Sequence, residues 1–242
     1  MKKSNTCHLK GFFLACIFFS STAIKAQYNP NPLIDRVKMN NLGNQVNNNP
    51  MYKDESLRIS SGTPYFRDVW MRADIFAVAG KTFERIPVKL NLMMGQLLFL
   101  DRDGSEKEMI NKLLRVEMSD SSTGEKFVFI PVEELAKPKD ANMIVWCEVI
   151  EEGNATLLKK TNKVLYQNKT YPSDPKEKVI EESFIYYLRL DGQLYPLKRL
   201  KDLVPLLAKS LPSISSFNPT GQTKEEQWES MVIFYNQQNT NK

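Results

Sequence analysis

The stretch 183-SFIYYLRLDGQLYPLK-198 decides the fold class. Two runs of aliphatic and aromatic residues flank Asp191-Gly192, and an Asp-Gly pair between such runs is the strongest short signal of a β-hairpin. Strands that are joined by so short a turn are antiparallel, because parallel neighbours need a crossover of a dozen or more residues. The stretch therefore predicts an antiparallel hairpin.

Four further turn signals lie upstream, between runs of the same kind. They are Gly80, Met94-Gly95, Ser121–Gly124 and Gly153-Asn154. Glycine and small polar residues between β-branched and aromatic runs are typical of hairpin turns. We therefore expect a mainly β protein with a C-terminal α part, in which residues 56–198 form an antiparallel β domain. This domain is predicted to be a curved meander or a partial barrel.

The periodicity changes to a helical one in residues 199–239. Four apolar residues share one face of a helix in the segment 224-KEEQWESMVIFYNQQ-238: Trp228, Met231, Val232 and Tyr235. Thr223 and Glu226 have the spacing of a capping box at its start. A second set, Leu200, Leu203, Val204 and Leu207, predicts another helix, which Pro205 is expected to kink or split. Both helices need an apolar partner surface, and an open face of the sheet is the nearest one.

The N-terminus has the pattern of a secretory signal peptide. Lysines without acidic residues precede the apolar run 11-GFFLACIFFSSTAI-24, and "KAQ" follows it. We expect residues 1–26 to be removed by cleavage between Ala26 and Gln27. The run is too short to span a bilayer, which needs about 20 apolar residues, so no transmembrane segment is expected after cleavage. As an alternative, "FLAC" at 13–16 resembles a lipobox, which would make Cys16 a lipidated N-terminus.

Cleavage would remove the only histidine, His8, together with the neighbouring Cys7. Ser-His-Asp and Cys-His hydrolysis both require an imidazole base, so these classes are excluded for the mature chain. Zinc sites built on histidine or on several thiolates are excluded as well, and no cofactor is expected. The formal charge would fall from +5 to about +1, which removes the charge argument for binding nucleic acid.

Residues 27–55 follow the leader and are rich in asparagine, with three prolines. Such a composition buries too little apolar surface to offset the entropy lost on ordering. We expect a flexible spacer here.

Two motifs of reactive or metal-binding type have simpler structural explanations. Cys147 lies in "MIVWCEVI" on the apolar side of an alternating run, which predicts a buried structural thiol. Asp101, Asp103 and Ser105 fit the first positions of a calcium loop in 101-DRDGSEKEMINK-112. That loop requires glycine at its sixth position and glutamate at its twelfth, where this chain has Glu106 and Lys112. We expect a hairpin tip.

Three other patterns are weak evidence for a catalytic or nucleic-acid-binding site. "SDPK" at Ser173–Lys176 matches S-x-x-K, but prolines surround it and the companion motifs are absent. The pairs Glu133-Glu134, Glu151-Glu152 and Glu181-Glu182 are expected to be solvated loop charges, because adjacent strand residues point to opposite faces. The aromatic and basic residues near the last hairpin are attributed to a strand ladder followed by a helix start: Tyr186, Tyr187, Lys198, Arg199 and Lys201.

Five segments occur in a recognisable order: "GTPYFRD" at 62–68, "FERIPVKLNLMMGQLLF" at 83–99, "FVFIP" at 127–131, "YYLRLDGQLYPLKRLKDLVPLL" at 186–207 and "WESMVIFYN" at 228–236. In this order the chain resembles a set of uncharacterised secreted proteins common in Bacteroidota, over nearly all of residues 57–238. The resemblance implies an exported cell-envelope protein of a Gram-negative bacterium, periplasmic or associated with the outer membrane. It implies no activity and no catalytic residue.

Three functions remain open from the sequence. The first is a non-catalytic binding or adaptor module for another envelope protein, which predicts a contiguous exposed apolar patch. The second is a periplasmic carrier of an apolar ligand such as a lipid, which predicts an internal cavity of several hundred cubic ångströms. The third is a histidine-independent hydrolase, which predicts two carboxylates about 5–10 Å apart in a cleft.

Overall fold

The structure, a computed structural model, describes residues 59–136, 143–168 and 177–239. The predicted signal peptide with its Ala26–Gln27 cleavage site, Cys16, the spacer at 27–55 and the Ser173–Lys176 motif lie outside the described residues.

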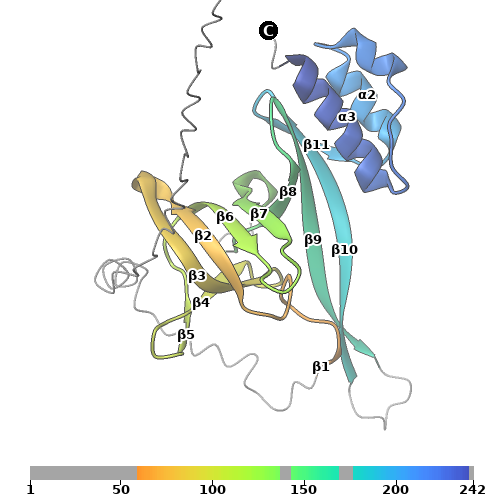
Figure 1. Ribbon diagram of the computed structural model, residues 1–242. Coiled ribbons are helices and arrows are strands. Elements are labelled where there is room, and N and C mark those ends of the chain that lie inside the picture. The colour runs from red at the N-terminus through yellow and green to blue at the C-terminus, as the bar shows by residue number, and fades with distance from the viewer. Residues whose placement is uncertain (1–58, 137–142, 169–176, 240–242) are drawn as a thin grey trace, which may run out of the picture.

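Within the described residues, eleven strands form one open, mostly antiparallel sheet, and helices follow it, so the predicted fold class is confirmed (Figure 1). The strands are β1 Ile59–Ser61, β2 Met71–Ala77, β3 Lys81–Asn91, β4 Gln96–Leu100, β5 Glu106–Glu108, β6 Leu113–Ser119, β7 Lys126–Pro131, β8 Trp146–Glu151, β9 Ala155–Asn168, β10 Glu177–Leu190 and β11 Gln193–Leu197. The helices are α2 Leu200–Leu207 and α3 Lys224–Asn239, with short 3-10 turns η1 Val78–Gly80, η2 Glu133–Leu135 and η4 Pro212–Ser216.

The strand order is β1-β10-β9-β8-β7-β6-β2-β3-β4-β5, and β11 also pairs with β10. Most neighbours are consecutive, as a meander requires. At one point the path departs from the expected meander, because β6 returns to lie beside β2 in a Greek-key arrangement. At another, β1 pairs with β10 in parallel.

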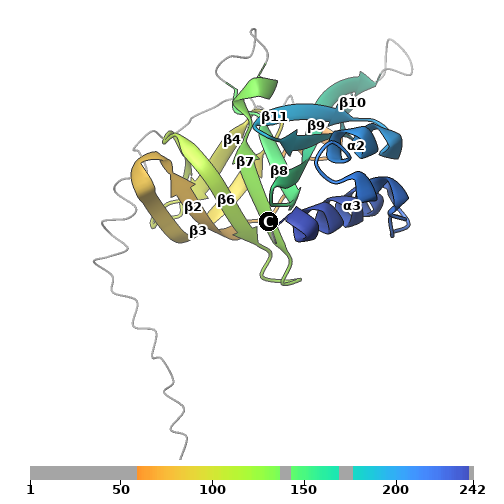
Figure 2. The ribbon, with the colours of Figure 1, turned by 90° about the horizontal axis from the view of Figure 1, so that it is seen from above.

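Strands β2 to β7 curl around a dense apolar core, and we call this part the curled lobe (Figure 2). Its inward side chains are almost completely buried, among them Ile75, Val88, Phe99 and Phe129. The first residue of β8 helps to hold the curl, because the Trp146 indole N–H donates to the carbonyl oxygen of Gly95 over 3.1 Å.

The helices pack on one face of the sheet at the end where β10 turns into β11 (Figure 1). The four residues predicted for the buried face of α3, Trp228, Met231, Val232 and Tyr235, are all buried there. The Thr223–Glu226 capping box is also present: Glu226 N donates to Thr223 Oγ1 over 3.2 Å, and Thr223 N donates to Glu226 Oε2 over 3.1 Å. The sheet face is therefore the partner surface that these amphipathic helices require.

One buried polar contact fixes α3 to the turn between β8 and β9. The side-chain oxygen of Asn236 accepts from the backbone N–H of Ala155 over 2.9 Å, and its Nδ2 donates to the carbonyl oxygen of the same residue over 2.9 Å. Gly153 leaves room for this amide, since a Cβ there would lie 2.4 Å from Asn236 Nδ2. The turn and the helix therefore fit only in this arrangement.

All five predicted turns connect successive strands. At the Asp191-Gly192 turn both residues have positive φ, 50° and 74°, which is the geometry that an Asp-Gly pair favours. The prediction that Pro205 splits its helix is wrong: α2 runs through Pro205 to Leu207. Its buried side chains, Leu203 and Leu207, hold the helix against the sheet.

Candidate functional site

Strands β9 and β10 pair over their whole lengths, from Ala155–Leu190 to Asn168–Glu177, and form a long hairpin that we call the arm. Close to the Asp191-Gly192 turn, β8, β11 and the helices surround it. Farther along, β9 extends beyond its last pair with β8, Glu148–Lys159. In the described residues the middle of the arm is thus a ribbon of two strands.

Large apolar side chains are exposed on this ribbon. Phe184 is 47% exposed on the face that, farther along the arm, carries the helices. Val164, Tyr166 and Ile185 are 43%, 50% and 38% exposed on the opposite face, as the register of β9 with β10 places them. Strands of this kind normally bury such residues, so their exposure marks a surface able to contact something else.

The opposite face borders a hollow of about 560 Å³ beside the start of β8. Val164 and Ile185 form one wall, and the exposed Ile144 forms another. We call Ile144, Val164, Tyr166 and Ile185 the arm patch. Lys160 and Lys163 also line the hollow, and Lys163 forms an ion pair with Glu182 over 2.6 Å.

A polar row crosses the sheet where the arm meets the helices. The register places Phe129, Glu148, Lys159, Tyr186 and Leu197 side by side on one face of β7 to β11. The row therefore separates the core of the curled lobe from the core under the helices, on the same side of the sheet.

The charges of this row are paired with α3. Lys159 Nζ lies 2.8 Å from Glu225 Oε2, and the Tyr186 hydroxyl donates to the same oxygen. Burial raises the pKa of the Glu148 carboxyl, with Lys159 lowering it and Glu225 raising it. Burial and the Glu225 hydrogen bond also raise the pKa of the Tyr186 hydroxyl. Because Lys159 forms an ion pair with Glu225, and Glu225 also accepts a hydrogen bond from the Tyr186 hydroxyl, these residues connect the sheet to α3.

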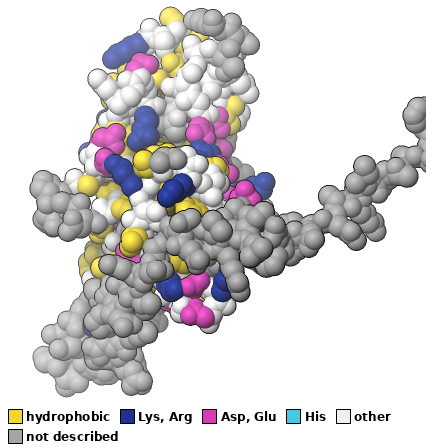
Figure 3. Space-filling model, turned by 90° about the vertical axis from the view of Figure 1, so that its left-hand side faces the viewer, with side chains coloured by type: hydrophobic (Ala, Val, Ile, Leu, Met, Phe, Trp, Pro, Cys, Tyr) yellow, Lys and Arg dark blue, Asp and Glu magenta, His cyan; other side chains and the backbone are white. Residues whose placement is uncertain are grey.

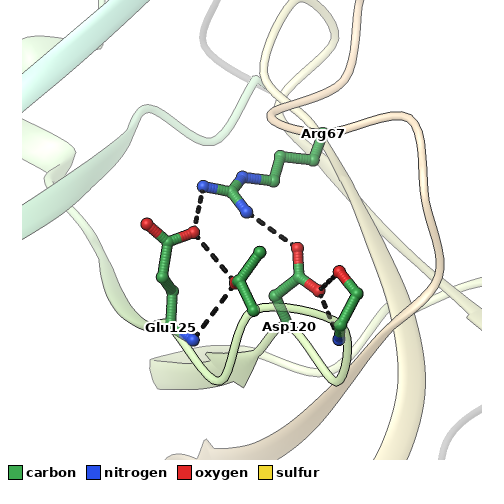
Figure 4. Close-up of polar contacts among 5 residues, drawn as sticks. Arg67, Asp120 and Glu125 are labelled. Carbon is green, nitrogen blue, oxygen red and sulfur yellow. Dashed lines mark hydrogen bonds and ion pairs between the residues drawn. The ribbon is translucent and has the colours of Figure 1, made fainter.

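A second charged cluster lies at the β6–β7 turn (Figure 4). The two terminal nitrogens of Arg67 each lie 2.7 Å from a carboxylate, one from Asp120 and one from Glu125. The guanidinium stacks on the ring of Phe127, 4.5 Å from its centroid. Hydrogen bonds from the Ser122 hydroxyl and backbone, with Arg67, lower the pKa of Asp120 to about 2. The charged groups of this cluster form hydrogen bonds and ion pairs with one another, so the cluster stabilises the β6–β7 turn.

The face seen from the side of the β2–β3 hairpin differs from the arm, because hydrophobic, basic and acidic side chains are interspersed on it (Figure 3). A shallow hollow of about 290 Å³ on β2, β3, β6 and β7 is lined by charges of both signs, including Arg72, Asp74 and Glu117. This mixture is typical of a solvated surface.

Cys147 is where the sequence predicted it. It is completely buried with Val132, Val145 and Leu158, and burial raises its pKa to about 12. The thiol is therefore structural, as expected. The start of β8 is buried on both faces, since Trp146, the residue before Cys147, belongs to the core of the curled lobe.

The hairpin tip predicted for 101–112 is shorter in the structure: residues 101–105 connect β4 to β5, and Glu106–Glu108 form β5 itself. Asp101 forms an ion pair with Lys107, and Asp103 Oδ1 accepts from the backbone N–H of Ser105 over 2.9 Å. Across the described ranges, no three side chains of the usual metal-binding types form a cluster that could hold an ion.

The three glutamate pairs lie at three separate places, and the prediction of loop charges is wrong for one of them. Glu181 and Glu182 lie within β10, where Glu182 pairs with Lys163 over 2.6 Å. Glu133 and Glu134 form η2, and Glu151 and Glu152 lie at the β8–β9 turn. The sequence did not predict the two carboxylates that the fold brings to the same lysine, Glu148 and Glu225, because 77 positions of chain separate them. The strand register places Glu148 beside Lys159, and the packing of α3 on the sheet brings Glu225 to that lysine.

The aromatic and basic residues near the last hairpin are placed as expected. Tyr186 and Tyr187 lie in β10, and Lys198 and Arg199 precede α2. Among the helices described, none is long and apolar enough to cross a membrane.

Comparison with known proteins gives no match to a family model, to a curated protein or to a solved structure.

Proposed function

We propose that this is an exported cell-envelope protein that acts as a non-catalytic binding module, and that its arm contacts another polypeptide. The observation that carries the proposal is the arm patch, in which four large apolar side chains between 36% and 50% exposed gather at one hollow and along one strand face. Burying such residues against a partner is favourable by about 25 cal/mol per Å² of apolar surface. Export rests on the leader sequence and on the resemblance.

The two alternative functions have less support. A carrier needs an apolar cavity, but the interior of the curled lobe is occupied by Phe99, Phe129 and Met118, each at most 2% exposed. A carboxylate hydrolase needs a free acid and base in a cleft. Glu225 is held by Lys159 and Tyr186, and Glu182 by Lys163.

Site-specific photo-crosslinking in the native cell tests the proposal. A photoreactive residue at Ile185 or at Val164 should give the same crosslinked partner, identified by mass spectrometry from both positions. The matched control is Leu114, which is 55% exposed but lies on β6 in the curled lobe. If the Leu114 variant captures the same partner equally well, or if neither arm position captures one, the arm is not the contact surface.

Export is tested separately. N-terminal sequencing of the protein from the envelope fraction should begin at Gln27-Tyr28-Asn29. A chain that begins at Met1 would contradict export, and a blocked chain that begins at Cys16 would identify a lipoprotein.

A further inference from the structure

Strand β10 has a gap along its outer edge. β1 pairs with it as far as Val179, and β11 pairs with it from Tyr186 onward. Between these two partners lie Ile180, which is buried and has Gly62 beside its carbonyl oxygen, and the five residues Glu181–Ile185, which we call the edge gap. All five residues are exposed. They pair with β9 on the inner side of β10, and on the outer side no strand in the described part of the chain pairs with them.

The register shows which backbone groups face the edge gap. In a two-residue hairpin the residues that flank the turn form a hydrogen-bonded pair, here Leu190 and Gln193. Every second residue of β10 therefore directs its N–H and C=O toward β11, and by alternation Glu182 and Phe184 direct theirs into the gap. The β1 end of the strand shows the same alternation. Lys178, four residues before Glu182, directs its carbonyl oxygen to this edge, where it accepts from the Ser60 hydroxyl over 3.0 Å.

An open groove of about 850 Å³ lies at the same place, between the edge of β10 and the start of α3. Phe184, Leu197 and Trp228 supply its apolar lining. The groove thus combines unpaired strand backbone with an apolar wall, which are the two features by which an added strand is recognised.

The charge of the groove is uneven. Glu225 is paired with Lys159, and the Glu226 carboxylate accepts from the backbone N–H groups of Gln222 and Thr223 at the helix start. Lys198 and Lys224 also line the groove, and neither forms an ion pair with another described residue. Three lysines and two glutamates line the groove, so a net formal charge of about +1 lies at the β11 end, and Glu181 lies at the other end of the gap.

We propose that the edge gap binds an extended segment of a partner polypeptide, about five residues long, which adds a strand to β10. This inference rests on the proposed function and names the chemistry of its partner. The segment carries an apolar side chain against Phe184 and an acidic group toward Lys198 and Lys224. Five residues of strand span about 17 Å.

The occupant is not β10 of a second copy. That strand has fourteen residues, and beside the edge gap it would collide with β1 at one end and β11 at the other. Only a short segment whose chain bends away at both ends enters the gap.

Amide exchange in the free protein, followed by NMR, tests the geometry. The amides of Glu182 and Phe184 should exchange at least 100-fold faster than those of Glu181, Ser183 and Ile185, which donate to β9. Equal protection along these five residues would show that the edge is already covered and would overturn the inference.

Binding is tested with a phage-displayed library of random heptapeptides on the full mature chain. Enriched peptides should alternate apolar residues and carry an acidic residue at one end. One synthetic peptide from the selection should protect the amides of Glu182 and Phe184. It should bind at least 10-fold more weakly to Glu182→Pro, which removes one edge-facing N–H, and within 2-fold of normal to Glu182→Ala. The charge-reversed Lys198→Glu/Lys224→Glu variant should weaken it at least 5-fold.

A second measurement does not depend on the proline variant folding. The same peptide, N-methylated at every second backbone nitrogen in either register, should lose at least 10-fold in affinity in one register only. Equal binding of both N-methylated peptides, or no enrichment at all, overturns strand addition. If photo-crosslinking at Val164, which lies on β9 outside the edge gap, still captures a partner in that case, the proposed binding function stands without this edge.

Discussion

The curled lobe and the middle of the arm are built from the same kind of strand, but they bury their side chains very differently. In the lobe, Phe129 lies between neighbouring strands under a curved sheet and is 2% exposed. In the arm, Phe184 has one neighbouring strand and is 47% exposed. The apolar residues of a strand are thus a property of the sequence, whereas their burial depends on how many strands and layers surround them. An exposed apolar ribbon inside an otherwise well-packed protein is a reason to look for a partner.

The largest expected effect is a direct test of this difference. Phe129→Ala should lower the free energy of unfolding by about 3–5 kcal/mol, because it leaves a cavity beside Phe66, whose ring centroid lies 4.9 Å away. Phe184→Ala should change it by less than about 0.5 kcal/mol. Urea unfolding of the two variants measures both values. Similar losses for the two variants would mean that the arm is packed as tightly as the lobe.

A smaller effect is expected where the helices join the arm. Asn236→Ala should cost about 2 kcal/mol, because the buried N–H and C=O of Ala155 both lose their partner. Gln238→Ala, at an exposed position two residues farther along α3, should stay within about 0.5 kcal/mol. Equal thermal unfolding curves for the two variants would show that apolar packing alone holds α3 in place.

The smallest effect is the pH dependence of the β6–β7 turn of the lobe. The folded pKa of Asp120, about 2, lies below the ordinary value of 3.8, so the carboxylate stabilises the native state at neutral pH. This contribution should be lost as the pH falls from about 4 to about 2. The difference in urea midpoint between the normal chain and Asp120→Asn should therefore shrink over that range.

Ser122→Ala sharpens the same test, because the Ser122 hydroxyl is the largest cause of the lowered pKa. In this variant the Asp120 carboxyl should titrate at a higher pH, which NMR detects directly. An unchanged titration would assign the effect to Arg67 and the backbone instead.

Local signals in the sequence were sufficient for the turns and for α3. Glycines with positive φ, such as Gly95 at 69°, and the spacing of Trp228 and Tyr235 act within a few residues, so they can be read one segment at a time. The same holds for Cys147, whose burial follows from the alternation around it. Of the two expectations for Pro205, a kink or a split, the split was wrong, because the burial of Leu203 and Leu207 offsets the local cost of a proline.

The candidate site could not be predicted in the same way. The edge gap exists because β1 ends at Ser61 and β11 ends at Leu197. The residues of the gap, 181-EESFI-185, carry no signal that predicts where those two strands end. Similarly, the tie between Lys159 and Glu225 depends on how α3 lies on the sheet. One sequence signal was available but unused: Asn236 is a poor helix former at an inward position, which often marks a specific polar contact.

The parallel pairing of β1 with β10 has a consequence for how the chain reaches its native state. Ser60 and Lys178 are 118 positions apart along the chain, yet they share a hydrogen bond. Because the polypeptide is synthesised from its N-terminus, β1 can pair with β10 only after the intervening chain has been made. Contacts so distant along the chain slow the search for the native topology. We therefore expect the pairing of β1 with β10 to form late in folding.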